Sequence, residues 1–290
     1  MALTVDGAFR EFIERLTPSP AESDAAKRHR ASIEDCLRAK LGMASFFRTG
    51  SFGNGTSIRG YSDVDYFAVV PPASLLADSG ATLRRFRAVL SKRFPYTPIT
   101  VRPPAVRIPF GTNRSEATEV VPAAQTGHQN RFPVYMIPDG TGSWRYAGPE
   151  AHNSFVAEVD ERLGGTVRPV VRFIKAWKFV RSVPVSSFYL EMRVASYAAA
   201  GERELIYPLD VAGVLESLWD DQLMPFLDPM GIAGTVKACE TATQRSTALS
   251  RLRIAVTRTQ KALELDYAGK VRAAIRWWNQ VFGNRFPAHG

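Results

Sequence analysis

The sequence holds little cysteine, little histidine and no long apolar run. Of its 290 residues, two are cysteine and four are histidine. The separation of Cys36 from Cys239 excludes a disulfide framework and the spacing of a cysteine zinc site. No stretch approaches the roughly 20 apolar residues that a membrane-spanning helix needs, and residues 1–6 lack the build of a signal peptide. We therefore expect a cytoplasmic globular protein with no membrane partner.

Acidic residues are outnumbered, with 28 Asp and Glu against 37 Lys and Arg, for a formal net charge of +9. An excess of this size favours a polyanionic partner, and nucleic acids and nucleoside triphosphates both qualify. The basic residues are dispersed along the chain and do not form a low-complexity tail. Most of them are therefore expected on solvated helix faces, and the charge alone does not indicate nucleic-acid binding.

The most informative segment runs from Thr49 to Val70 and reads TGSFGNGTSIRGYSDVDYFAVV. Asp63 and Asp65 alternate with apolar residues at the start of a predicted buried strand, where residues two apart face the same way. Both carboxylates then converge on one point. Hard oxygen ligands at this spacing suit Mg²⁺, which is commonly held by one or two carboxylates and substrate phosphates.

The glycine-rich loop before these acids predicts a phosphate site. Gly50 and the later glycines let backbone N–H groups approach a triphosphate, and Ser51 adds a hydroxyl donor. The alternative is a flexible turn followed by two strand-capping aspartates. Gly-Ser, eleven intervening residues and Asp-x-Asp running into an apolar strand together resemble the signature of the DNA polymerase β-like nucleotidyltransferase superfamily.

That superfamily has a third acid on a neighbouring strand. The best match is Glu119 in the segment 117–123, a short apolar strand closed by a proline. It resembles the family's acid-Val-Val-Pro-Ala segment, although Asp is the more usual ligand at this position. Glu116 is the alternative, but its place before the apolar run is more typical of a solvated loop.

The pattern of elements predicts an α+β protein with a mixed sheet and a helical lobe. We divide the chain near Gly148–Pro149 into a catalytic lobe with N-terminal helices, residues 1–148, and a helical lobe, residues 149–290. The active site is expected in the cleft between them. Predicted helices span 6–16, 21–41, 82–93, 149–163, 167–180, 187–199 and 211–223, followed by a long basic pair ending at 282. Predicted strands span 43–48, 64–70, 105–110, 118–121 and 131–136.

Two helical segments, 172–178 and 185–191, are the best candidates for substrate contacts in the second lobe. Lys175 and Lys178 lie at i, i+3 and share a face apart from an apolar stripe. Taken alone, the first segment would be an amphipathic helix with solvated lysines.

The Gly-Ser loop, the three acids, Lys-Ala-Trp-Lys and Ser-Ser-Phe-Tyr-Leu-Glu occur in the order found in the bacterial cGAS/DncV-like nucleotidyltransferases, and the resemblance spans most of the chain. It implies that Lys175 and Ser187 hold the donor triphosphate, with Lys178 as a further nucleotide contact. Phe188 would stack on a nucleobase, an interaction worth about 1–3 kcal/mol per base. The chain lacks the cysteine/histidine insertion that cGAS uses for zinc-dependent DNA sensing.

The resemblance also implies the chemistry. Two Mg²⁺ ions, or Mn²⁺ in their place, would be held by Asp63, Asp65 and Glu119 for an in-line displacement at the α-phosphate of ATP, GTP or another triphosphate. Repetition of the step would close a cyclic oligonucleotide, with a cyclic dinucleotide as the first expectation. In the family such products are second messengers of anti-phage defence, read by an effector protein. A nucleic-acid or protein activator is not indicated by the residues.

Two other hypotheses stay open at this stage. A polymerase β-like transferase that modifies tRNA or a protein would require a macromolecular acceptor. A catalytically inactive nucleotide- or RNA-binding scaffold would bind nucleotide without releasing pyrophosphate. No pattern that we recognise encodes the base identity, ring size or 2′ or 3′ linkage of the product, the activating cue or the oligomeric state.

Overall fold

The computed structural model describes residues 4–18, 20–61, 64–111 and 116–287. The chain divides into two compact units. The helical unit comprises Met1–Thr17, Phe155–Pro229 and Thr235–Gly290, and the sheet unit comprises Pro18–Ser154 and Met230–Gly234. The sequence-based division at residues 148–149 cuts the chain once, whereas the chain passes from one of these units to the other at four points.

The sheet unit is built on a seven-stranded mixed sheet with the order β1-β2-β5-β4-β3, in which β6 pairs with β5 and β7 with β6. The pair β2–β5 is parallel and every other pair is antiparallel. The elements are α2 (Pro20–Leu41), β1 (Ser45–Thr49), α3 (Gly50–Gly53), β2 (Val64–Val69), η1 (Pro72–Ser74), α4 (Ser79–Arg93), β3 (Thr100–Arg102), β4 (Ala105–Phe110), β5 (Glu116–Gln129), β6 (Phe132–Pro138) and β7 (Trp144–Ala147).

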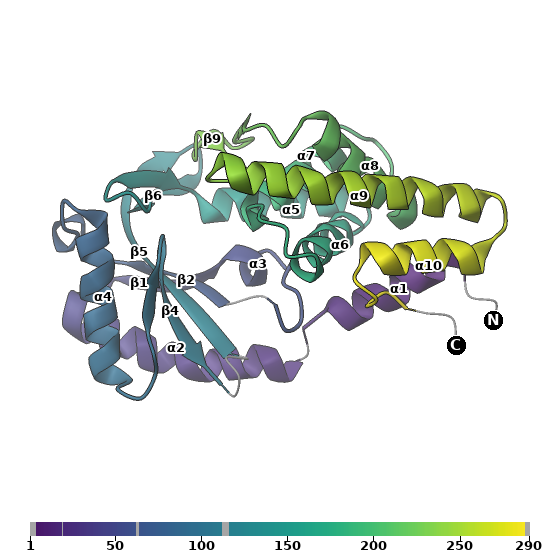
Figure 1. Ribbon diagram of the computed structural model, residues 1–290. Coiled ribbons are helices and arrows are strands. Elements are labelled where there is room, and N and C mark those ends of the chain that lie inside the picture. The colour runs from purple at the N-terminus through teal and green to yellow at the C-terminus, as the bar shows by residue number, and fades with distance from the viewer. Residues whose placement is uncertain (1–3, 19, 62–63, 112–115, 288–290) are drawn as a thin grey trace. The chain divides into compact units, whose positions relative to one another are not determined.

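Alternation along the central strands builds a different core on each face of this sheet. On one face, Tyr66 and Val120 pack with apolar residues of α2 and α4, such as Ile33 and Phe86. Figure 1 shows these two helices beside β1, β2 and β4. On the other face, Phe67 and Val121 pack with residues of β6. Polar side chains of β2 and β5 that alternate in step with Phe67 and Val121 lie on the same face as these two residues. They therefore point away from α2 and α4.

The helical unit contains no large sheet within the described ranges. Its elements are α1 (Val5–Leu16), the second half of α5 (Pro149–Arg162), α6 (Val167–Val180), α7 (Ser187–Ala199), α8 (Tyr207–Asp220), α9 (Ala242–Tyr267) and α10 (Val271–Val281), with the short pair β8 (Phe226–Leu227) and β9 (Thr235–Val236). Helices α1 and α10 are far apart in the sequence but lie side by side in this unit (Figure 1).

Aromatic packing explains why α1 belongs to the helical unit. The ring of Phe9 is fully buried and lies 5.0 Å from Phe173 of α6, 4.9 Å from Trp278 of α10 and 4.9 Å from Phe286. Edge-to-face pairs of this kind add to the free energy gained by burial. Across the described ranges, every helix is too short or too polar to span a membrane.

Candidate active site

Two of the predicted carboxylates occupy neighbouring positions in the sheet unit. Asp65 of β2 pairs in register with Glu119 of the parallel strand β5. Neighbouring strands lie about 4.8 Å apart, and paired residues project from the same face of a sheet. The same row continues to Thr49 on β1 and to Arg107 on β4. The fold therefore sets the two acids side by side, although they are 54 positions apart in the numbering.

Arg107 is the basic neighbour of this pair, and the sequence reasoning missed it. Its Nε atom lies 3.8 Å from Oε1 of Glu119, and the two side chains are 15% and 24% exposed. The guanidinium offsets part of the negative charge of the acids. The available signal was one charged residue inside the otherwise apolar strand 105–110, which the alternation alone does not connect to Glu119.

Asp63 lies outside the described residues, so its predicted role is carried by the sequence alone. Glu116 begins β5, paired with Phe110 of β4 and three positions before Glu119. Among the described residues, no three His, Cys, Asp or Glu side chains gather closely enough to hold a metal ion.

The residues that are described fit a magnesium site in their chemistry. Adjacent carboxylates repel each other, and a divalent cation that shares their oxygens removes that penalty. Gly50 leaves room beside them, because a Cβ atom at residue 50 would stand 2.0 Å from Oδ2 of Asp65. The backbone at Gly50 is also left-handed, with φ +58°, a conformation that glycine adopts without steric cost.

The Gly-Ser loop is held by its own hydrogen bonds. Its first residues form the short turn α3, and the carbonyl of Ser51 accepts from the N–H of Thr56 at 2.8 Å. The side-chain oxygen of Asn54 accepts from the backbone N–H and the hydroxyl of Thr56, at 3.2 and 2.7 Å. Thr56 is fully buried and Asn54 is 6% exposed. The described part of the loop is therefore tied together by hydrogen bonds within it.

In the helical unit, the end of α6 meets the start of α7 through Lys178 and Ser187. The ammonium group of Lys178 donates to the hydroxyl of Ser187 at 2.5 Å. Ser186 caps α7 by accepting from the N–H of Tyr189, which fixes the position of Ser187 in the first turn. Burial, with a smaller contribution from the nearby charge of Lys175, lowers the pKa of Lys178 to about 8.

Lys175 is buried, with 1% of its surface exposed. Its ammonium group lies 3.8 Å from Oε1 of Glu191 on α7, whose side chain is 6% exposed. The solvated-face alternative is wrong for Lys175. Glu191 is a second residue that sequence reasoning did not single out, although it stands in the quoted Ser-Ser-Phe-Tyr-Leu-Glu segment.

Phe188 is half-buried and packs against the apolar cluster of Val156, Met192 and Ala195, together with Phe155 and Phe226. These contacts anchor one side of the ring within the helical unit. Stacking of the ring on a nucleobase stays a prediction, as do the nucleotide contacts of Gly50, Ser51, Lys175, Lys178 and Ser187.

Comparisons with known proteins agree with this architecture. The model of the Second Messenger Oligonucleotide or Dinucleotide Synthetase domain matches residues 3–160. A probable cyclic nucleotide synthase of Bacillus cereus (strain VD146) is 28% identical over 173 residues, 59% of this chain and 52% of that protein. The match thus spans about half the length of that relative. A cyclic AMP-AMP-AMP synthase of Acinetobacter sp. (strain ATCC 27244 / 9458) is 25% identical over 98% of this chain and 86% of its own.

Among solved structures, CdnC of E. coli MS115-1 in its structure with ATP has a TM-score of 0.76 at 18% identity, covering 97% of this chain and 98% of that one. The same protein in complex with HORMA-deltaN has a TM-score of 0.76 at 17% identity, with the same coverage of each chain. At such identities the likeness concerns the fold.

The fold is that of CdnC and also of DncV from Escherichia coli, whose 3'-deoxy GTP bound form has a TM-score of 0.72 at 16% identity, covering 94% of each chain. Because the domain model covers more than half of the sequence, the chain belongs to the Second Messenger Oligonucleotide or Dinucleotide Synthetase family.

Proposed function

We propose that this protein is a metal-dependent nucleotidyltransferase that joins nucleoside triphosphates into a cyclic oligonucleotide. The observation that carries the proposal is the placement of Asp65 beside Glu119, next to a glycine whose missing side chain leaves space at Asp65. A family of synthetases of second-messenger oligonucleotides provides the context for that pair.

Each candidate residue has a role in this proposal. Asp63, Asp65 and Glu119 would hold two Mg²⁺ ions, which supply charge stabilisation at the reacting phosphate when bound. Arg107 keeps the carboxyl group of Glu119 oriented through its ion pair. Gly50 and Ser51 would present backbone and hydroxyl donors to phosphate oxygens. Lys178, together with Ser187, would offset charge on the donor triphosphate.

Lys175 binds phosphate in this proposal only with the help of Glu191. A buried ammonium group is expensive unless a partner offsets its charge, and Glu191 lies 3.8 Å away. Glu191 therefore offsets the charge of Lys175 and orients its ammonium group, as a positioning residue.

The ring size of the product is the open part of the proposal. We keep a cyclic dinucleotide as the expectation. The Acinetobacter relative is named as a synthase of a cyclic trinucleotide, so a cyclic trimer is the second product to be measured. We propose further that the product is a messenger of anti-phage defence that a separate effector protein binds. CdnC forms a complex with HORMA-deltaN, which supports the search for a protein partner of this chain.

The test is incubation of the purified protein with each combination of ATP, GTP, CTP and UTP in the presence of Mg²⁺ or Mn²⁺. Products are identified by mass spectrometry and linkage-specific nuclease digestion. A cyclic product resists phosphatase because ring closure leaves no terminal phosphate. Transfer of labelled nucleotide only to added tRNA or protein would instead establish the macromolecule-modifying alternative. Nucleotide binding without pyrophosphate release, also with a HORMA-type partner, would establish the inactive scaffold.

A further inference from the structure

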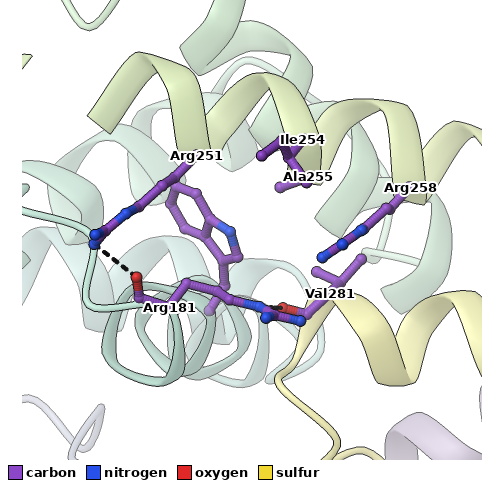
Figure 2. A pocket seen from close by; sticks show the side chains of 7 residues that line it. Arg181, Arg251, Ile254, Ala255, Arg258 and Val281 are labelled. Carbon is purple, nitrogen blue, oxygen red and sulfur yellow. Dashed lines mark hydrogen bonds between the residues drawn. The ribbon is translucent and has the colours of Figure 1, made fainter. Parts of the chain in front are cut away.

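A cavity of about 290 Å³ opens in the helical unit beside α6, α9 and α10. It is lined by Trp177, Arg181, Arg251, Ile254, Ala255, Arg258 and Val281. Figure 2 shows Arg181, Arg251 and Arg258 around the opening, with Ile254 and Ala255 on the α9 side. None of these residues has a role in the function proposed above.

Backbone carbonyl groups hold the three guanidinium groups in place. Arg181 donates through Nε to the carbonyl of Val281 at 3.1 Å, and Arg258 donates through Nη1 to the carbonyl of Gln280 at 3.0 Å. Arg251 donates to the carbonyl of Arg181 at 2.8 Å and also to that of Ser182. A carbonyl oxygen carries no formal charge, so these bonds orient the arginines and leave their positive charges in place.

No carboxylate forms an ion pair with these three arginines in the part of the chain that the structure describes. Burial, and then the like charge of Arg258, lowers the pKa of the guanidinium of Arg181. Three fixed positive charges around one cavity create a potential that favours an anion.

The cavity also has an apolar side. Ile254 is 48% exposed on the rim, whereas Trp177 is 1% exposed and Ala255 is 2% exposed. An exposed isoleucine next to arginines suits a ligand that has both a flat apolar part and a charged part. The volume is near the lower end of the roughly 300–1,000 Å³ that ligand pockets occupy, which restricts the ligand to a small molecule.

We propose that this cavity binds a small phosphate monoester with a planar base, of the nucleoside monophosphate class. A phosphate monoester carries a charge of about −1.5 to −2 at pH 7, so it compensates more of the three arginines than a single carboxylate does. Guanidinium groups bind phosphate through paired hydrogen bonds. The base would then lie against Ile254 and the neighbouring apolar wall.

This cavity lies away from Lys175, one of the candidate triphosphate contacts on the same helix. Trp177 follows Lys175 by two positions, a rotation of about 200° around α6 at 3.6 residues per turn. The cavity and Lys175 thus lie on nearly opposite sides of the helix. Arg251 also binds the carbonyl groups of the turn after α6, five and six positions before Ser187.

Isothermal titration of the full chain with AMP, GMP, CMP and UMP in the presence of EDTA tests the proposal. We expect at least one monophosphate to bind, and we expect Ile254→Glu to raise the Kd of that monophosphate by more than tenfold. Ile254→Gln, which changes the same exposed position without adding charge, should raise this Kd by a smaller factor. Arg258→Gln should raise the Kd by about tenfold through loss of a charge-assisted contact. Arg253→Gln should not change it, because this exposed residue lies about 200° around α9 from Arg251.

Additional titrations separate this site from other phosphate sites. Lys178→Ala should leave monophosphate binding in EDTA unchanged, and an unphosphorylated single-stranded oligonucleotide should bind more weakly than the monophosphate. The proposal is overturned if no monophosphate binds the folded protein, if Lys178→Ala abolishes binding while Ile254→Glu does not, or if only the oligonucleotide binds. Circular dichroism of each variant confirms that the protein tested is folded.

Discussion

A methyl group on Gly50 and the carboxylate of Asp65 cannot occupy the structure together. The Cβ atom of any other residue at position 50 would lie 2.0 Å from Oδ2 of Asp65 and 2.8 Å from its Cγ. The Gly-Ser loop and strand β2 are therefore fitted to each other at this contact, and a side chain at residue 50 would displace Asp65.

The Gly50→Ala variant should lose activity by more than tenfold because the new side chain displaces Asp65. A matched control is Gly60→Ala. Both glycines have positive φ, +58° and +72°, and each substitution therefore carries about 1–2 kcal/mol of backbone strain. Only residue 50 meets a neighbour, since nothing lies within 4 Å of a Cβ at residue 60. Turnover of triphosphate by the two variants, with their free energies of unfolding, checks the prediction, and equal losses would contradict it.

Removal of the carboxylate charges should stop chemistry and preserve the fold. We expect Asp63→Asn combined with Asp65→Asn, and separately Glu119→Gln, to lower turnover by at least about 100-fold, as is typical when electrostatic stabilisation of the transition state is lost. Glu116→Gln should retain activity. Pyrophosphate release is the measurement, with Mg²⁺ and then Mn²⁺ present. Full activity of Glu119→Gln together with an inactive Glu116→Gln would show that the third acid is Glu116.

Triphosphate affinity should depend on pH through Lys178. Its pKa is lowered to about 8, so the folded protein loses this positive charge as the pH rises through 8. The Kd for a non-hydrolysable triphosphate should therefore increase between pH 7 and pH 9. Lys178→Arg keeps its charge throughout this range and should flatten the profile. A profile that is the same for Lys178→Arg and for the unchanged protein would remove Lys178 from the binding site.

The same shift has a consequence for stability, with a defined sign. Between the folded pKa of about 8 and the unfolded pKa of about 10.4, the unfolded chain binds more protons than the folded protein at this group. The contribution of Lys178 to the free energy of unfolding therefore becomes more favourable as the pH rises through that window. Chemical denaturation at pH 7.5 and pH 9.5 measures the free energy of unfolding of the unchanged protein and of Lys178→Met. The part of the pH dependence that Lys178 contributes should be absent from the variant.

The buried pair of Lys175 and Glu191 separates a role in folding from a role in binding. Glu191→Leu alone should destabilise the protein by about 3–5 kcal/mol, because the ammonium group of Lys175 stays buried after its carboxylate partner is removed. The double variant Lys175→Met with Glu191→Leu should recover most of that loss, since apolar replacements of buried pairs are often neutral. Its apparent KM for triphosphate should nevertheless rise. An unchanged KM in the folded double variant would limit this pair to a structural role.

Much of the fold could be predicted from local patterns. The predicted helices at 167–180 and 187–199 coincide with α6 and α7, because apolar periodicity is a local signal. The short strands β3 and β7 and the full length of β5 were missed. Edge strands of three or four residues have too little alternation to be recognised, and the second half of β5 is defined by its pairing with β6.

The candidate site could be predicted only as far as its residues lie in contiguous motifs. The alternation around Asp65 and the segment around Glu119 identified two acids, but the register that joins them is a property of strand pairing. Arg107 and Glu191 were missed for the same reason. Each faces its partner from another strand or helix, and nothing within a few residues of either one marks that contact.

The packing of Phe9 between α6 and α10 has a consequence for how the chain can be rearranged. A single cut near residues 154–155 would yield two fragments that each retain a piece of the other's unit, namely α1 in the first and residues 230–234 in the second. The ring of Phe9 lies 4.9 Å from that of Phe286, so α1 and the segment after α10 approach each other within one unit. A circular permutant that joins the two ends of the chain and opens it before residue 18 would make the helical unit continuous but for residues 230–234. In the order of the sequence itself, α1 precedes the sheet unit, and the helices α6 and α10 that bury Phe9 follow it.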